Sequence, residues 1–195
     1  MSPVAVLTPH EVAELSGAPK RLIEKAIEER VLSPRTRLSP GMRRARRMLP
    51  AYSVAYAAAL NGLDLNLSLR HKKRLARIIA ETPVNALAKT RAHIAPAVEI
   101  DLGQLVGDAI EKTEKYRAAR DAFIVIDEDI KGGTPIIRGT RMTVYAILGR
   151  VEHGDTIEDV LADNPDLTRA AVEAAVIYAR THPLVGRPGG RPWTS

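Results

Sequence analysis

Apolar residues recur at helical spacing over most of this chain, and the clearest case follows Pro19. On a helical wheel the charged residues of 20–28 fall on one face and the apolar residues on the other. This pattern predicts an amphipathic helix with one buried side. The basic residues of its open face are Lys20, Arg21 and Lys25.

A shorter helix is predicted just before it. Thr8 is a good N-cap, Pro9 suits the first helical position, and Glu11 occupies the capping-box position. Ser16-Gly17 then ends this helix. Two helices joined by a tight turn containing glycine form a helix-turn-helix, whose second helix meets the DNA groove with its N-terminal residues. We therefore predict that the three basic residues of 20–28 contact DNA.

The segment after this helix pair is basic and unsuited to a helix, because Pro34, Pro40 and Gly41 interrupt it. A basic loop in this position is typical of a wing, and each arginine that meets a phosphate releases counterions. A solvated loop is the alternative, but the neighbouring basic helix favours DNA binding. Whether these arginines meet bases or phosphates stays open. The predicted contacts are Arg35, Arg37, Arg43, Arg44, Arg46 and Arg47.

From Leu7 to Leu32 the sequence resembles the winged helix-turn-helix of MerR-like regulators. Many of those regulators sense metals through cysteines, and this chain has none. The resemblance therefore implies DNA binding without metal sensing.

The middle of the chain contains further helical patterns at residues 52–60, 69–80 and 101–110. Ser68 and Asp101 are the expected caps of the last two. The outer face of the predicted helix 69–80 is basic. This face either lies along the phosphate backbone of DNA or is simply solvated. Val98–Ile100 suggests a short strand, and we interpret 83–121 as a connector or dimerisation segment.

The last third of the chain has a different character. Residues 123–126 predict a strand, and residues 135–144 predict a β-hairpin that turns at Gly139. Three helices follow, with Thr156 and Thr168 capping the second and third. The third is apolar nearly all round, which predicts burial on several sides. Acidic residues near this helix would repel the phosphate groups of DNA. We therefore predict that this three-helix unit serves dimerisation or partner binding and does not bind DNA.

Residues 126–144, together with 157–165 and 178–183, closely resemble the bacterial domain of unknown function 433. Members of that family are commonly antitoxins. Those joined to a MerR-like module resemble VapB antitoxins, whose toxins are PIN-domain ribonucleases. The resemblance thus implies binding of operator DNA and neutralisation of a toxin.

Residues 183–195 form a tail rich in proline and glycine that holds the only tryptophan of the chain. Aromatic and arginine side chains are common interface anchors. We predict toxin binding by Arg187, Arg191 and Trp193, with an arginine entering the acidic toxin site and Trp193 filling an apolar pocket. A solvated tail is the alternative.

Composition narrows the functional classes. The 195 residues carry a net charge of +6, yet residues 121–195 contain eight Lys/Arg against eleven Asp/Glu. The absence of cysteine excludes disulfides and thiol catalysis. The histidines are scattered, so we expect no enzyme activity, no metal and no cofactor. We see no signal peptide or membrane segment, and we expect a cytoplasmic protein.

Together these patterns predict a mainly α protein with an N-terminal winged helix-turn-helix plus a C-terminal β-hairpin and three-helix homeodomain-like unit. The expected divisions are a DNA-binding module at 1–82, a connector at 83–121, an antitoxin module at 122–182 and a toxin-binding tail at 183–195. The expected function is that of a type II antitoxin. As a homodimer it would repress its own operon and inhibit a cognate PIN-domain ribonuclease. The alternatives are a MerR-like regulator that responds to a small effector without a toxin, and an adaptor that binds only protein.

Overall fold

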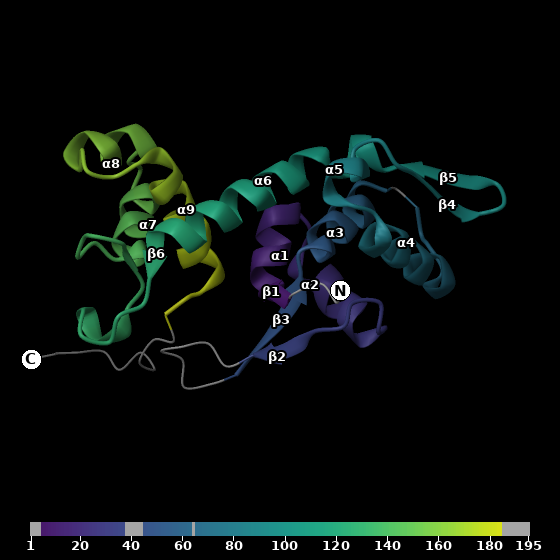
Figure 1. The fold of residues 1–195 in the computed structure, drawn as a ribbon, viewed down its shortest axis with the longest axis horizontal. Helices are drawn as coiled ribbons and strands as arrows, with labels where there is room; N and C mark the ends of the chain where they lie inside the picture. Colours follow the sequence, from purple (N-terminus) through teal and green to yellow (C-terminus); the bar gives the residue numbers. More distant parts are fainter. Residues whose placement is uncertain (1–4, 38–44, 64, 185–195) are drawn as a thin grey trace, which may run out of the picture.

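The computed structural model describes residues 5–37, 45–63 and 65–184 (Figure 1). Within these ranges it has nine α-helices, one short 3-10 helix and three small antiparallel sheets, which confirms the predicted mainly α class. The strands are β1 (Ala5–Leu7), β2 (Arg35–Arg37), β3 (Arg46–Pro50), β4 (Arg91–Ala95), β5 (Val98–Asp101), β6 (Ile124–Val125) and β7 (Ile136–Ile137). The helices are α1 (Pro9–Ser16), α2 (Lys20–Glu28), α3 (Tyr52–Gly62), α4 (Leu69–Glu81), α5 (Val84–Leu87), α6 (Leu102–Phe123), α7 (Val144–Glu152), α8 (Ile157–Asp163) and α9 (Arg169–Thr181).

Side-chain caps fix where most of the helices begin. A hydroxyl or carboxylate accepts a hydrogen bond from a backbone N–H of the first turn, which satisfies a donor that has no partner inside the helix. Every cap predicted from the sequence is confirmed, and Thr143 at the start of α7 is an additional one. The capping residues are Thr8, Ser68, Asp101, Thr143, Thr156 and Thr168.

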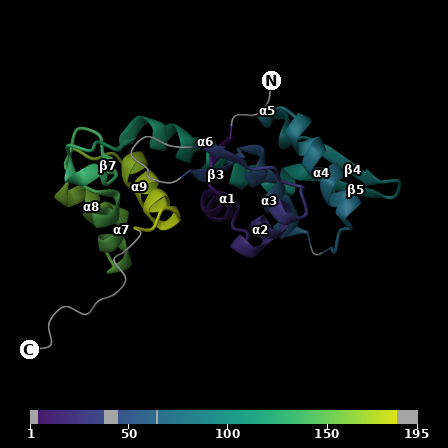
Figure 2. The ribbon, with the colours of Figure 1, turned by 90° about the horizontal axis from the view of Figure 1, so that it is seen from below.

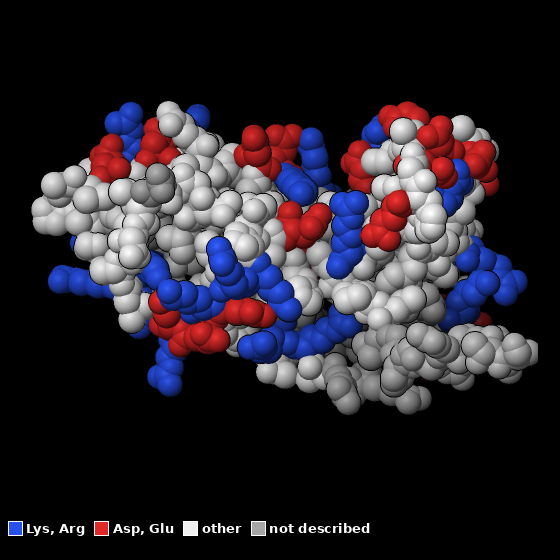
Figure 3. All heavy atoms as spheres, turned by 180° about the vertical axis from the view of Figure 1, so that it is seen from behind, with Lys and Arg blue, Asp and Glu red and all other residues white. Residues whose placement is uncertain are grey.

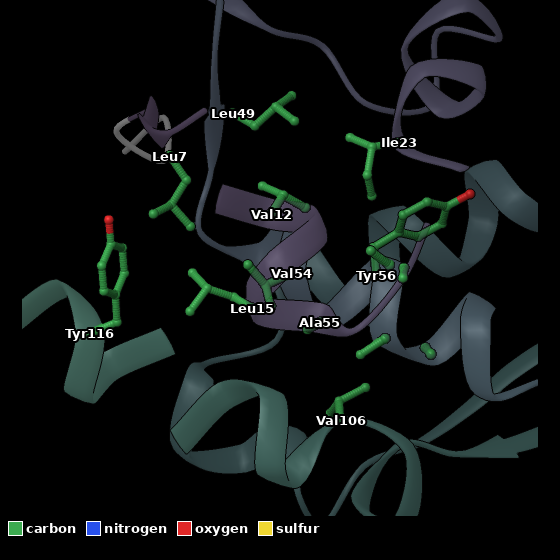
Figure 4. Packing of buried hydrophobic residues seen from close by; sticks show 14 of the residues in the cluster. Leu7, Val12, Leu15, Ile23, Leu49, Val54, Ala55, Tyr56, Val106 and Tyr116 are labelled. Atoms are coloured by element: carbon green, nitrogen blue, oxygen red, sulfur yellow. The ribbon is translucent and has the colours of Figure 1, made fainter. Parts of the chain in front are cut away.

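The N-terminal part packs a three-stranded sheet, in the order β1-β3-β2, against α1, and α1 in turn packs against α2. Helix α3 is the centre of this part, because residues 53–59 are all buried and the helix contacts α1, α4 and α6. Figure 4 shows Leu15 of α1 beside Val54 of α3, with Val106 of α6 on the ribbon below them. A helix rich in alanine allows such close approach on every side.

Two features of the middle segment differ from the sequence predictions. The short strand at β5 pairs with β4, which was not predicted. In β4 exposed and buried residues do alternate, with Ala92 and Ile94 buried, but the strand has only five residues. Helix α6 has 22 residues and continues to Phe123, the first residue of the strand predicted at 123–126, so the strand β6 begins at Ile124. Burial of Tyr116 and Ala119 supports the charged second half of this helix.

The C-terminal part is built from α7, α8 and α9, with α9 buried on most of its surface as predicted. The predicted hairpin at 135–144 is confirmed in part. The chain turns at Gly139, where φ is 77°, and an antiparallel bridge joins Ile136 to Thr143. Only its first half forms a regular strand, β7, and this strand also pairs with β6 on its other side.

Helix α6 joins the two ends of the molecule. It packs against α3 and α1 on one side and against α9 on the other. Figures 1 and 2 show the C-terminal helices at one end, the β4–β5 hairpin at the opposite end and α6 between them. The buried residues of all these parts belong to one hydrophobic cluster. No helix in the described parts of the chain is long and apolar enough to cross a membrane.

Candidate nucleic-acid interface

The helix pair α1–α2 presents basic side chains on a rigid frame. Gly17 connects the helices with φ of 68°, a left-handed conformation that costs glycine little. Ile23 and Ala26 anchor the inner face of α2. The basic residues predicted from the sequence, Lys20, Arg21 and Lys25, are all exposed on the opposite face.

The β2–β3 hairpin supplies a second basic element next to α2. The strands pair antiparallel, with Thr36 opposite Arg47. The side chains of Arg35 and Arg47 are exposed, and Arg46 is half-buried. Of the other predicted contacts, the side chain of Arg37 and the whole of Arg43 and Arg44 lie outside the described residues.

The fold brings α2 and β3 together at a crevice of about 320 Å³. Lys20 from α2 lines this crevice with Arg46 and Arg47 from β3, although 26 positions separate Lys20 from Arg46. His182 and Pro183 form another wall, contributed by the chain just after α9. Glu24 also lines this crevice, so its three cations outnumber one carboxylate, and this net positive charge in a concave space suits a phosphate group.

Acidic residues modulate the charge of this face. Glu24 forms an i,i+4 ion pair with Lys20, with 3.4 Å between the charged atoms, and Glu28 is exposed one turn further along α2. Figure 3 shows basic residues along one edge of the molecule, with a group of acidic residues among them. Acidic residues also gather over the C-terminal helices in this view. The basic character therefore belongs to the N-terminal part, as the distribution of charge along the sequence predicts.

Helix α4 extends the basic surface. Lys72 is bound to Glu29, which follows α2, with 3.0 Å between Nζ and Oε2. This ion pair fixes α4 relative to the basic helix. The remaining basic residues of the helix are exposed, and the two interpretations offered from the sequence, phosphate contact and plain solvation, both stay open. These residues are Arg70, Lys73, Arg74 and Arg77.

A buried polar cluster joins α1 to α6. Glu11 is only 1% exposed, and its Oε1 accepts hydrogen bonds from the Tyr116 hydroxyl at 2.6 Å and from Nη1 of Arg120 at 3.2 Å. Its Oε2 accepts from the backbone N–H of Thr8. Burial, together with the charge of Glu11, raises the pKa of Tyr116, so the hydroxyl stays protonated and donates. The sequence identified Glu11 only as a capping residue, because its partners lie about a hundred positions away.

A second concave surface lies between α6 and α9. It is a groove of about 860 Å³, floored by apolar side chains that include Phe123, Ala174 and Ile177. Charges of both signs line its rim, including Lys115 paired with Glu111. Sequence analysis did not reveal this groove, because it arises only when the two helices pack side by side.

Among the described residues, no three His, Asp or Glu side chains lie close enough together to hold a metal ion. The predicted toxin contacts Arg187, Arg191 and Trp193 lie outside the described residues, so their role stays a prediction.

Comparison with known proteins shows a partial similarity to one curated protein. Over 88 residues, the chain is 39% identical to an uncharacterized protein of Sinorhizobium fredii, y4eO. The match covers 45% of this chain and 39% of that protein, so the chain spans well under half of its relative. No solved structure matches the chain.

The C-terminal part has a family match. The resemblance predicted from the sequence is confirmed over the strand pair and the three helices that follow it. Residues 124–179 match the model of a family described as "Protein of unknown function (DUF433)".

Proposed function

We propose that this chain binds double-stranded DNA through α2 and the β2–β3 hairpin, which would act as the recognition helix and wing of a winged helix-turn-helix. The observation that carries this proposal is the crevice in which Lys20, Arg46 and Arg47 converge. Phosphate neutralisation by such groups releases counterions and supplies most of the sequence-independent affinity for DNA.

Base selection would come from the exposed face of α2. Arg21 and Lys25 have the chemistry to contact the acceptor edge of guanine. Glu28 is exposed on the same helix and would accept a hydrogen bond from the amino group of cytosine. A mixed face of this kind discriminates between bases better than a uniformly basic one, which attracts any sequence equally.

We further propose that the chain works as an antitoxin that represses its own operon as a homodimer and inhibits a PIN-domain ribonuclease. The match of residues 124–179 to DUF433 supports this, given the resemblance of that domain to antitoxin modules. The acidic, tightly packed α7–α9 unit suits a protein partner better than DNA. One helix-turn-helix covers only half a site, so a pair of chains fits a palindromic operator.

A charge-removal experiment tests DNA binding. The probe is a labelled duplex of about 40 base pairs from the region upstream of the gene, titrated with the full chain at several salt concentrations. Replacing Lys20 and Arg47 together by alanine removes two phosphate contacts, so the slope of log K against log[salt] falls by about 1.8.

The matched control replaces Lys112 and Lys115, which line the α6–α9 groove away from the crevice. This control also removes two positive charges and leaves the slope close to that of the wild type. Equal effects of the two double variants would refute the proposed interface.

The antitoxin role is tested by expressing the tagged chain with the product of its neighbouring gene. We expect a small metal-dependent ribonuclease to co-purify in a silent form and to become active once this chain is removed. Purification of the chain alone, with promoter binding intact, would refute the toxin partnership and leave a transcription regulator.

The groove between α6 and α9 favours a second candidate, a regulator that responds to a small effector without a toxin. Its volume of about 860 Å³ lies within the usual range for small-molecule sites. The test is whether a small molecule alone changes the affinity of the purified chain for its promoter duplex. Under the antitoxin proposal, only the protein partner has this effect.

A further inference from the structure

A third concave space, the α3–α6 cavity, lies where α6 meets α3, α4 and α5. Its volume is about 320 Å³, at the lower end of the usual range for small-molecule sites. Helix α6 lines it with Ile110, Thr113, Glu114 and Arg117, which follow the spacing of one helical face. The groove between α6 and α9 is lined by other residues of α6, so the two spaces lie on different faces of this helix.

The inner wall of the α3–α6 cavity is apolar. Val54 and Ala55 of α3, Ile79 of α4 and Leu87 of α5 line it, and all four side chains are buried. Val84, at the start of α5, also lines the cavity but is 50% exposed, so it lies at the rim where the cavity opens to solvent. An apolar wall that is reached from solvent suits the apolar body of a small organic molecule.

Arg117 places a cation beside this apolar wall. Its Nη1 donates to the exposed Glu114 at 3.1 Å, but its Nε is buried and has no hydrogen-bond partner among the described residues. Nε and Nη2 together form one edge of the planar guanidinium, and such an edge matches the two oxygens of a carboxylate. Because an unpaired buried donor costs free energy, a ligand that brings the missing acceptor is favoured at this position.

We propose that the α3–α6 cavity binds a small monocarboxylate with an apolar body, and that the Nε edge of Arg117 holds the carboxylate. The apolar body lies against Val54, Ile79 and Leu87. A phosphate or a dicarboxylate would turn further charge toward this apolar wall, where it has no partner, and the guanidinium would repel an ammonium group. This inference depends neither on DNA binding nor on a toxin partner.

Isothermal titration calorimetry of the full chain with straight-chain carboxylates, from butanoate to octanoate, provides the first test. Each added methylene is buried against the apolar wall, so the affinity rises about fourfold per carbon until the wall is covered. The matching primary alcohols lack the charge and bind about 10-fold more weakly. Equal affinities of acids and alcohols would overturn the proposal, as would the absence of binding by every acid in the series.

The second test removes the cation. Arg117→Gln lowers the affinity for octanoate about 10-fold and leaves the affinity for octanol at the wild-type value. The matched control is Arg180→Gln, which removes an arginine from the α6–α9 groove and keeps both affinities. Equal losses of octanoate affinity in the two variants would mean that the acids follow the overall positive charge, and the site assigned to Arg117 would be wrong.

A third variant tests the cavity without touching the cation. Val84→Trp places a large ring at the rim on a side chain that is half exposed, so the fold does not depend on this position. The ring obstructs the opening, and the affinities for octanoate and octanol both fall. Unchanged affinities in this variant would place the ligand elsewhere and refute the proposal, even if Arg117→Gln failed to fold.

Discussion

The hydroxyl of Tyr116 offers a direct measure of how strongly α1 is held against α6. It donates to Glu11 at 2.6 Å, and both side chains are almost fully buried. Replacement by phenylalanine removes this hydrogen bond and leaves the ring in place, so no large cavity forms. The carboxylate keeps only two of its partners, the Thr8 backbone N–H and Arg120.

The expected cost follows from the charge of the acceptor. A hydrogen bond to a charged group contributes about 1.5–3 kcal/mol to stability, against about 1 kcal/mol for a neutral pair. We expect Tyr116→Phe to cost about 2 kcal/mol. In a chain of this size that lowers the melting temperature by about 4–8 °C.

Urea denaturation followed by circular dichroism provides the measurement, with Tyr145→Phe as the matched control. The Tyr145 hydroxyl also donates at 2.6 Å, but its acceptor is the neutral carbonyl of His182. We expect the control to cost about half as much, with the same denaturant slope. Equal costs, or a cost below about 0.5 kcal/mol for Tyr116→Phe, would refute the importance of the buried charge.

Four other predictions follow from single sites. In α6, a Cβ at Gly103 would lie 2.2 Å from the Ala88 carbonyl oxygen, so Gly103→Ala destabilises by about 1–3 kcal/mol. Gly107→Ala, with open space around it, stabilises by about 0.5–1 kcal/mol in the same urea assay. The Tyr56 hydroxyl is buried without a partner among the described residues, so Tyr56→Phe leaves the free energy of unfolding unchanged or higher, and a loss above about 1 kcal/mol would contradict this. Burial lowers the pKa of His182 below its ordinary value of 6.5, so only the unfolded state gains a proton as the pH falls through that value. The free energy of unfolding therefore keeps its full value above pH 6.5 and decreases below it. In the variant His182→Gln, the melting temperature should change less between about pH 7.5 and about pH 5.5 than in the wild type.

The parts of the fold that the sequence predicts well depend on local chemistry. Thr8 and Thr156 start helices because their hydroxyls reach N–H groups three residues away. The faces of α2 follow from helical spacing alone, and Ile23 is buried as that spacing requires. Each of these depends on residues within one or two helical turns.

What the sequence misses depends on contacts between distant segments. The bond between Tyr116 and Glu11 joins residues 105 positions apart. The crevice needs Lys20 and Arg47 to meet a wall formed by Pro183. No periodic pattern in the sequence predicts a contact between distant segments, because the pattern of each segment is the same whichever other segment packs against it. The basic residues of α2 and β3 could therefore be predicted from the sequence, whereas the wall of the crevice that Pro183 helps to form could not.

The position of Tyr116 has a consequence for how the two surfaces of the molecule interact. Tyr116 is one of the residues that line the α6–α9 groove, although it is only 2% exposed, and its hydroxyl donates to Glu11 of α1. The first residues of α1, including His10, also line the basic crevice. A ligand that reached Tyr116 from the groove would therefore touch the residue that holds α1, which forms one wall of the proposed DNA-binding crevice. If such a ligand changes the affinity for DNA by some factor, linkage requires that DNA change the affinity for that ligand by the same factor. Because Tyr116→Phe cuts this connection while keeping the groove lined by a ring, it should reduce both effects equally.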